Sequence, residues 1–458
     1  MAERFEIMEK ALLTMLQEKK YVALRELLAT MNPIDVAGLF EDLEESRIPI
    51  LFRLLPKELA AETFVEMEPD AQELLIRGFS DNELKEIVDE LYDDDAAALV
   101  EEMPANVVKR ILKQADPEMR RSINQILRYP ENSAGSMMTT EYVALRPQMT
   151  VEEAILRIRR QGIDKETIYT CYVTEDRKLI GLVTVKDLLL AELDDTPVQE
   201  IMITNLISVT THTDQEEVAR MFSKYNFLAL PVVDGENRLV GIVTFDDAMD
   251  VMEDEATKDI EIMGGMLPSE KTYLRSSVFD LFKNRIPWLM LLMVSATFTG
   301  LIINAFEGAL AAQVALTAFI PMLMGTGGNS GSQSSVTVIR ALSLDELEIR
   351  DIWSVIWKEL RTSILCGIAL AVVCFGKIWL VDHILMGNED ITLMINVVVC
   401  LALAATVIFA KVVGGTLPLI AKALKMDPAV MASPFITTSV DAVSLLLYFV
   451  FASSLLGI

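Results

Sequence analysis

The sequence predicts a multidomain membrane protein: a superhelical α-helical N-terminal domain, an α+β domain with a tandem repeat, a connector helix and a transmembrane domain of five helices. Three observations lead to this prediction. The chain has 458 residues, which is long for a single domain. Its net charge of −27 lies almost entirely before Leu281, and long apolar stretches follow that residue. An acidic soluble half therefore precedes a membrane half.

Residues 1–128 are predicted to form short amphipathic helices in close succession. Pro33, Pro56 and Pro104 each precede apolar residues at helical spacing. Proline is favourable in a first helical turn because its missing N–H would have no helical partner there. The pattern indicates a stack of helical hairpins, similar to a small solenoid.

Residues 129–256 contain an internal repeat of about 60 residues. The segment 178–187 aligns with 238–247, and both segments place glycine, threonine and aspartate at matching positions. Each copy alternates short β-branched strands with helices, which predicts the order β-α-β-β-α.

A connector helix is predicted over 257–284 and the transmembrane domain over 285–458. Each apolar segment of this domain is long enough to cross a bilayer about 30 Å thick at about 1.5 Å per residue. The five segments are 286–306, 309–342, 364–385, 391–420 and 434–456.

The charged flanks of these segments predict a multi-pass plasma-membrane protein with a cytoplasmic N-terminus and an external C-terminus. The loops around Glu307 and over 382–390 contain no lysine or arginine, which places them outside. The N-terminal segment is amphipathic and acidic, unlike a cleavable signal peptide. The basic residues on the inner side are Lys271, Arg275, Lys283, Arg285, Arg340, Arg350, Lys358, Arg361, Lys422 and Lys425.

Asp441 is the only acidic or basic residue in the apolar stretch 434–458. A carboxylate at the centre of a membrane helix costs about 2.5–3.5 kcal/mol, so it is retained where it faces water or a cation. The hydroxyls of Thr437, Thr438 and Ser439 would line the same path. We therefore expect a route for a cation through the membrane.

A run of glycines between Gly325 and Gly331 predicts a second part of this path. Four glycines in seven residues are expected to open or kink a membrane helix, and the freed backbone groups then need water, polar side chains or an ion. Close helix packing on glycine is the alternative. Gly414, Gly415 and Pro418 predict another break, and Lys411 is expected to snorkel or to be paired.

The oxygen atoms expected along this path predict a hard cation, Mg²⁺ or Ca²⁺, because carboxylate, carbonyl and hydroxyl oxygens are the ligands that these ions prefer. With two histidines and four cysteines at no metal-ligand spacing, a zinc or transition-metal site is not expected, and the thiols are predicted to be reduced and packed. The net charge of −27 argues against binding nucleic acid.

Two acidic clusters in the soluble half predict a cation-dependent conformation. Asp247, Asp250 and Asp254 share one helix face, and Asp94 and Asp95 lie in a second cluster. Bringing such clusters together is unfavourable unless a divalent cation screens them, so an ion can select a compact arrangement. A solvated acidic face is the alternative.

The repeat resembles a tandem pair of cystathionine-β-synthase (CBS) modules, because Gly, Thr and Asp occupy the module's signature positions in both copies. The resemblance implies an adenine nucleotide, with ATP as a regulatory ligand, in the cleft between the copies. Tyr169 and Phe227 would stack on the base, and Lys186 and Asp187 are compatible with the phosphates and ribose. Helix capping by the threonine and aspartate residues is the alternative.

The whole chain resembles the MgtE family of magnesium transporters, most specifically in the segment 321–334 and in Asp441. The resemblance implies a homodimeric, Mg²⁺-selective channel in the lipid bilayer that Mg²⁺ closes from its cytoplasmic side, with the connector as a plug helix. Asp441 would receive hydrated Mg²⁺ and Asp427 would lie at the cytoplasmic mouth. The implied sensor and partner acids are Glu62, Asp94, Asp95, Asp214, Glu216, Asp247, Asp250, Glu255 and Asp259, and the residues expected to line the pore are Glu307, Gly325, Asn329 and Thr437.

Asn226, Lys258 and Ser433 depart from the residues that this family is expected to carry. The sequence is compatible with three other functions. They are a secondary transporter that couples Mg²⁺ to another ion, a sensor that uses its spans as an anchor, and an enzyme with a regulatory CBS pair. No nucleophile–base pair, phosphate-binding loop or metal triad in the sequence supports the enzyme.

Overall fold

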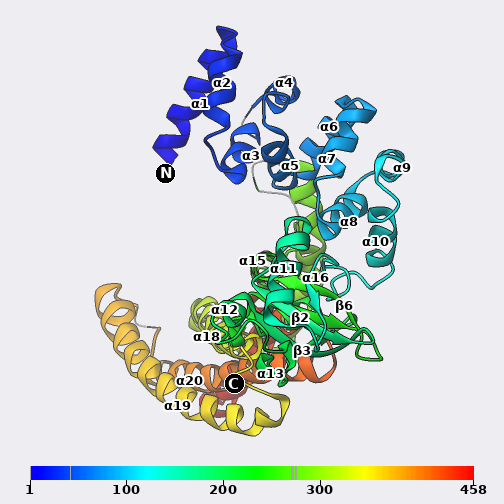
Figure 1. The fold of residues 1–458 in the computed structure, drawn as a ribbon. Helices are drawn as coiled ribbons and strands as arrows, with labels where there is room; N and C mark the ends of the chain where they lie inside the picture. Colours follow the sequence, from blue (N-terminus) through cyan, green and yellow to red (C-terminus); the bar gives the residue numbers. More distant parts are fainter. Residues whose placement is uncertain (1, 42, 270–272, 274–275, 389, 458) are drawn as a thin grey trace. The chain divides into compact units, whose positions relative to one another are not determined.

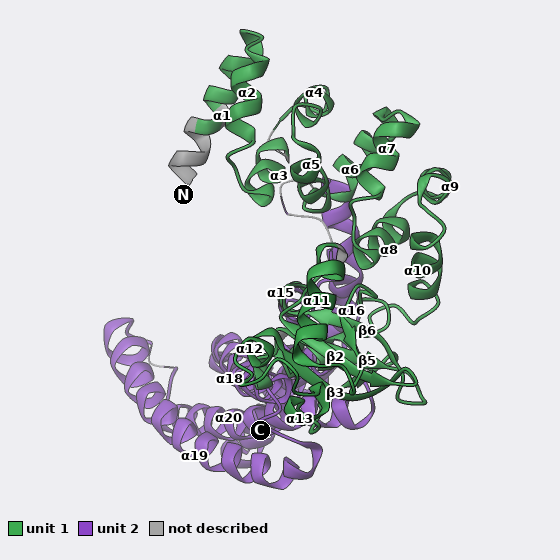
Figure 2. Cartoon of the chain, in the orientation of Figure 1, with its two compact units in different colours: residues 1–253 green, residues 254–458 purple. Residues whose placement is uncertain are grey.

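The computed structural model describes residues 2–41, 43–269, 273, 276–388 and 390–457. Two compact units divide the chain, Met1–Glu253 and Asp254–Ile458 (Figure 2). Part of the predicted connector, including Lys271 and Arg275, lies outside the described residues.

The N-terminal domain is a stack of short helices (Figure 1). Pro33 is the first residue of its helix, while Pro56 and Pro104 are N-caps, which confirms the expected role of proline. Alternate helices contact one another, α3 with α5, α5 with α7 and α7 with α9, as a superhelical stack requires. The bounds are α1 Ala2–Gln17, α2 Tyr21–Leu28, α3 Pro33–Glu41, α4 Ile48–Phe52, α5 Lys57–Val65, α6 Pro69–Gly78, α7 Asp81–Val88, α8 Asp93–Glu102, α9 Ala105–Gln114 and α10 Met119–Ile126.

The repeat forms two small sheets of the same topology, which confirms the predicted order of elements. In each sheet the first strand is parallel to the second, and the second is antiparallel to the third. The first copy comprises β1 Ala144–Leu145, α11 Val151–Gln161, η1 Gly162–Asp164, β2 Thr170–Glu175, β3 Lys178–Thr184 and α12 Val185–Leu189. The second comprises α13 Val198–Ile201, β4 Val209–Thr210, α14 Gln215–Tyr225, β5 Ala229–Val233, β6 Leu239–Thr244 and α15 Phe245–Met263.

The segment that precedes each copy packs on the sheet of the other copy. Ile203 forms a β-bridge with Leu182 of the first copy, and Met202 lies over Gly181 so closely that a Cβ there would be 2.5 Å from the methionine sulfur. The second copy repeats this contact at Gly241. Glycine in the signature is therefore required by the close approach of the other copy.

The connector is not one helix throughout. After α15 ends at Met263, Gly265 adopts a positive φ of 71°, which glycine tolerates without strain. The next helix, α16, begins at Val278, where Ser277 and Asp280 form a capping box.

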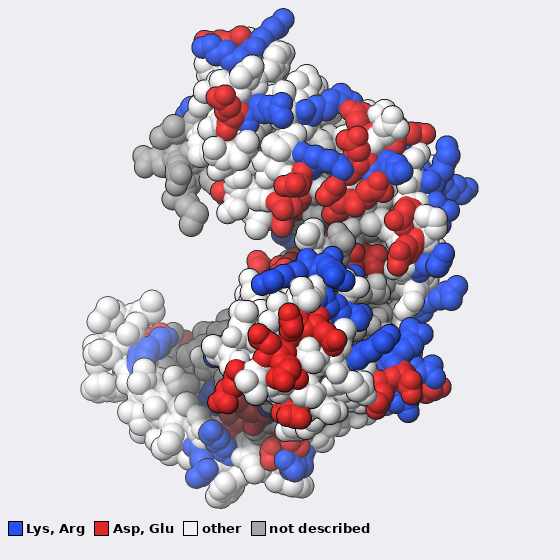
Figure 3. Space-filling model, viewed as in Figure 1, with Lys and Arg blue, Asp and Glu red and all other residues white. Residues whose placement is uncertain are grey.

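Five long helices form the membrane half: α16 Val278–Ala305, α18 Ile320–Ser343, α19 Ile352–Lys377, α20 Leu393–Ala423 and α21 Ser433–Leu456. Shorter elements connect them: α17 Glu307–Ala312, η2 Val314–Phe319, η3 Ile349–Asp351, the π-helical η4 Ile378–Leu385 and η5 Pro428–Met431. Four described stretches are long and apolar enough to span a bilayer, Val278–Ala305, Ile349–Leu385, Leu393–Ala423 and Pro428–Leu456. The surface that Figure 3 shows over α19 and α20 is mostly uncharged.

The predicted second span, 309–342, differs from a single apolar helix. It divides into α17, η2 and α18, and α18 carries the run of glycine, serine and asparagine that lowers its hydropathy. This helix packs against both α20 and α21, so protein rather than lipid covers much of its polar surface.

Candidate cation path and acidic clusters

The glycine run does not open its helix. α18 continues without a break from Ile320 to Ser343, so the prediction that the glycines open the helix was wrong. The glycines instead allow close helix packing: a Cβ on Gly414 of α20 would lie 2.2 Å from the Gly331 carbonyl oxygen. The break predicted near Pro418 was also wrong, because α20 runs through it to Ala423.

Asp441 lies on α21, the helix that packs on the glycine face of α18. A Cβ on Gly328 would come within 2.7 Å of Thr437 Cγ2, which shows how close the two helices approach. The Asp441 side chain is half-buried, and its carboxylate has no hydrogen-bond or ion-pair partner among the residues that the structure describes. It is a charged group of the membrane half that protein groups leave unsatisfied.

The hydroxyls near Asp441 are satisfied within their own helix. Thr437 and Thr438 both donate to the Pro434 carbonyl at 3.0 Å, and Ser439 donates to the Phe435 carbonyl at 2.9 Å. These bonds leave the hydroxyl oxygens able to accept from water.

The other predicted pore residues lie at exposed positions. Gly325 and Asn329 are exposed on α18, and Glu307 is exposed at the start of α17. Asp427 is also exposed, and its side chain caps η5 by accepting from the Ala429 N–H at 2.8 Å. Asp427 therefore has a structural role as the cap of η5, and its place at a cytoplasmic mouth stays a prediction.

Lys411 is buried in a polar layer between helices, which confirms that it is paired. Its Nζ donates to Gln333 Oε1 of α18 at 3.4 Å. In the neighbouring turn, Ser334 donates to Glu359 Oε2 of α19 at 2.7 Å. The layer joins α18, α19 and α20 by polar contacts.

An acidic cluster lies where α8 meets the repeat, within the first unit. Burial raises the pKa of Asp95 to about 7 and that of Asp247 to about 6, and it raises the pKa of Glu166 to about 8. Burial also raises the pKa of Asp94 well above its usual range, with Asp247 as the next cause. The carboxylates therefore repel one another in a poorly solvated position.

Two acids of this cluster, Glu166 and Glu66, were missed by sequence reasoning. Glu166 lies in a loop, and its Oε2 is buried with no hydrogen-bond partner. Glu66 follows α5, and burial and Asp250 raise its pKa. Glu66 lies four residues after the predicted Glu62, a helical spacing that could have indicated it, whereas nothing in the sequence around Glu166 points to the cluster. Among the described residues, no three histidine, cysteine, aspartate or glutamate side chains form a ready ligand set for a metal ion.

The remaining predicted acids occupy other positions. Glu62 is exposed on α5. Asp214 caps α14, accepting from the Glu216 N–H at 3.0 Å, and Glu216 pairs with Arg220 at 3.6 Å. Glu255 and Asp259 lie on α15.

Lys258 and Asn226, two of the residues expected to differ from the family pattern, have local structural roles. Lys258 pairs with Glu255 at 3.2 Å. Asn226 ends α14 with a positive φ of 55°, a conformation that asparagine adopts more readily than most residues.

Of the four residues predicted to bind a nucleotide, two have exposed side chains and two already make contacts within the protein. Tyr169 is 67% exposed, and Lys186 is exposed as well. Asp187 forms a capping box, in which its Oδ2 accepts from Thr184 Oγ1 at 2.6 Å. Phe227 is half-buried and stacks on Tyr225, with 5.4 Å between ring centroids.

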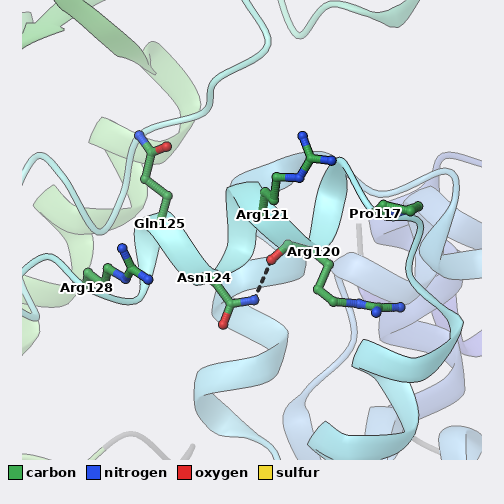
Figure 4. A pocket seen from close by; sticks show the side chains of 6 residues that line it. All are labelled: Pro117, Arg120, Arg121, Asn124, Gln125 and Arg128. Carbon is green, nitrogen blue, oxygen red and sulfur yellow. Dashed lines mark hydrogen bonds between the residues drawn. The ribbon is translucent and has the colours of Figure 1, made fainter.

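A separate pocket of about 580 Å³ lies on α10 (Figure 4). Three guanidinium groups line it, from Arg120, Arg121 and Arg128, together with Pro117, Asn124 and Gln125. Asn124 donates to the Arg120 carbonyl. Its positive charge makes the pocket unsuitable for a divalent cation.

Family models match most of the chain. The intracellular N domain of MgtE matches residues 31–132, the CBS domain matches 134–194 and 198–254, and the MgtE divalent cation transporter matches 320–451. Among solved structures, the cytosolic domain of the Mg²⁺ channel MgtE in complex with ATP is 41% identical. It covers 53% of this chain and 99% of that chain, with a TM-score of 0.51. The soluble part of a magnesium transporter, 30% identical, covers 55% and 99% with the same TM-score.

Curated relatives match over nearly their full length. The magnesium transporter MgtE of Thermus thermophilus is 38% identical over 96% of this chain and 97% of its own. That of Bacillus subtilis is 33% identical over 97% of this chain and 96% of its own. The likeness extends through the N-terminal domain, the CBS pair and the membrane half. The chain therefore belongs to the MgtE family of divalent cation transporters.

Proposed function

We propose that this protein conducts Mg²⁺ across the membrane and that Asp441 receives the hydrated ion. The observation that carries the proposal is the half-buried Asp441 carboxylate, which has no partner among the described residues. Mg²⁺ gives up its water reluctantly, so a single carboxylate with hydroxyl groups nearby suits a largely hydrated ion. Relatives of nearly equal length that are named magnesium transporters support the choice of ion.

The acidic cluster between α8 and α15 would act as the sensor. When cytoplasmic Mg²⁺ is low, repulsion among Asp94, Asp95, Asp247 and Glu166 opposes the compact arrangement. A bound cation removes this repulsion and selects the compact state, which would close the pore. Burial and the nearby charge of Asp250 also raise the pKa of Glu66, so this carboxylate would add to the repulsion.

The pore would form between two copies of the chain, with one Asp441 from each copy along a shared path. α16 has no buried residue in the single chain, so its apolar surface is available to lipid and to a second copy. The charge of the loops supports a cytoplasmic N-terminus and an external C-terminus.

ATP would bind in the CBS pair as a regulatory ligand. The ATP complex of a related cytosolic domain supports this assignment. In this chain the exposed Tyr169 ring can stack on adenine and the Lys186 ammonium can reach a phosphate. Asp187 and Phe227 are already used by a helix cap and by an aromatic stack.

Planar bilayers that contain the purified protein test the proposal. We expect a Mg²⁺ current that falls as cytoplasmic Mg²⁺ rises and that Asp441→Asn reduces by at least tenfold. Asp390→Asn, which removes an exposed carboxylate from a loop, is the matched control and should conduct normally. A normal current in Asp441→Asn would exclude Asp441 as the pore acid.

A secondary transporter that couples Mg²⁺ to another ion is the second candidate. The buried Lys411–Gln333 contact favours it, because a charged polar layer among helices can serve a coupled ion. The broken helices that would also favour it are absent from α18 and α20. Mg²⁺ flux that requires a second ion gradient would select this candidate over the channel.

A further inference from the structure

Two thiols that are 26 positions apart in the sequence meet inside the membrane half. Cys374 of α19 and Cys400 of α20 belong to one buried core cluster where α19 packs along α20, and their side chains interact. Their residues are only 6% and 7% exposed. A third sulfur comes from α18, where Met322 Sδ is 4.0 Å from Cys374 Sγ. α18, α19 and α20 thus each contribute one sulfur atom to the same buried cluster.

An amide completes this group. Asn396 Oδ1 accepts from Cys400 Sγ at 3.4 Å, and Asn396 Nδ2 donates to the Phe375 carbonyl at 3.2 Å. The second bond fixes the orientation of the amide, so its oxygen faces the thiols. Side chains outside a metal's direct ligands often orient ligands in this way.

We propose that Cys374, Cys400, Met322 and Asn396 form a binding site for a soft or borderline divalent cation such as Cd²⁺ or Zn²⁺. Thiolate and thioether sulfur favour such ions over Mg²⁺, which prefers oxygen. Each thiol loses its proton as its sulfur binds the cation, so two protons are released per ion. Two thiolates neutralise a divalent cation, which avoids the cost of a net charge in an apolar core.

The site is separate from the proposed Mg²⁺ path and does not depend on it. An ion bound there would join α18, α19 and α20, which are the helices that carry the glycine contacts and the Lys411 layer. Occupancy is therefore expected to hold these helices in one arrangement.

Cadmium titration of the reduced full-length protein, with the reductant removed, tests the site. Wild type should bind one Cd²⁺ per chain with a thiolate-to-cadmium charge-transfer band and release two protons, even in a large excess of Mg²⁺. Cys374→Ser and Cys400→Ser should each abolish the band. Asn396→Leu should weaken binding about tenfold, as is typical for orienting groups. Cys366→Ser and Cys171→Ser are the controls and should bind as wild type does.

A second measurement needs no substitution. In wild-type protein, Cd²⁺ should protect Cys374 and Cys400 from alkylation while leaving the half-buried Cys366 reactive, as read from peptides by mass spectrometry. Equal protection of Cys366, or a band that survives both serine variants, would overturn the proposal.

Discussion

Tyr169 and Asp187 were predicted to serve the same nucleotide, but their surroundings differ. The Asp187 carboxylate is held by the Thr184 hydroxyl and backbone N–H in a capping box. Tyr169 is 67% exposed, so its ring needs no rearrangement to receive a base. Tyr169 is therefore better placed than Asp187 to contact a nucleotide.

We expect Tyr169→Ala to weaken ATP binding by about tenfold, because stacking of a base on an aromatic ring contributes about 1–3 kcal/mol. Isothermal titration calorimetry on the full-length protein measures the change. Tyr21→Ala removes a tyrosine that is 42% exposed in the N-terminal domain, and it should leave the affinity unchanged. Equal affinities of Tyr169→Ala and wild type would exclude stacking on Tyr169.

Helix α18 shows how one composition can support two structures. Four glycines within seven residues are compatible with an opened helix that lines water and with a continuous helix packed closely on its neighbours. The neighbouring helices favour the continuous helix. α20 and α21 approach so closely that side chains at Gly327, Gly328 and Gly331 would collide with them.

The Gly414→Ala variant tests this packing, because its Cβ would lie 2.2 Å from the Gly331 carbonyl oxygen. We expect a destabilisation of about 1–3 kcal/mol, the usual cost of overpacking a core. Thermal unfolding in detergent, followed by the loss of monodisperse protein, measures it. Gly376→Ala in α19 is the matched control, since nothing lies within 4 Å of its Cβ, and alanine should stabilise that helix slightly. A Gly414→Ala protein as stable as wild type would contradict the close α18–α20 contact.

At the scale of the whole molecule, the uneven distribution of acidic residues affects the stability of the compact state. Almost all of the net charge of −27 belongs to the soluble half, and part of it is concentrated between α8 and the CBS pair. Folding that brings these acids together raises their pKa values above those of the unfolded chain, so protons and divalent cations favour the same compact state.

This relation predicts a pH dependence. The pKa of Asp95 rises from 3.8 to about 7, and that of Glu166 rises from 4.5 to about 8. The stability gained by protonation is fully present below the unfolded values and is lost as the pH rises through about 7 to 8. Without divalent cations, the protection of the amides in α8 and at the start of α15, taken relative to the intrinsic exchange rate at each pH, should therefore be larger at pH 6 than at pH 8, and Mg²⁺ should increase this protection more at pH 8.

Replacement of a single acid of the cluster separates repulsion within the cluster from the effect of the overall net charge. Glu166→Gln should reduce the pH dependence and slow exchange at pH 8 without Mg²⁺ by roughly tenfold, which corresponds to one pKa unit. Glu152→Gln removes an exposed charge from α11 and should change nothing. A Glu166→Gln protein that exchanges as fast as wild type would show that Glu166 does not contribute to the repulsion.

The sequence alone determined the order of the domains, the β-α-β-β-α repeat, the membrane half and the isolated Asp441, because periodicity, charge and apolar length are local properties of the chain. Tertiary structure alone decided three other features. α18 is continuous, because α20 and α21 fill the space beside its glycines. Glu166 joins the acids of α8, because the fold of the repeat carries its loop there. Cys374 and Cys400 share one buried cluster although no spacing relates them, because α19 packs along α20.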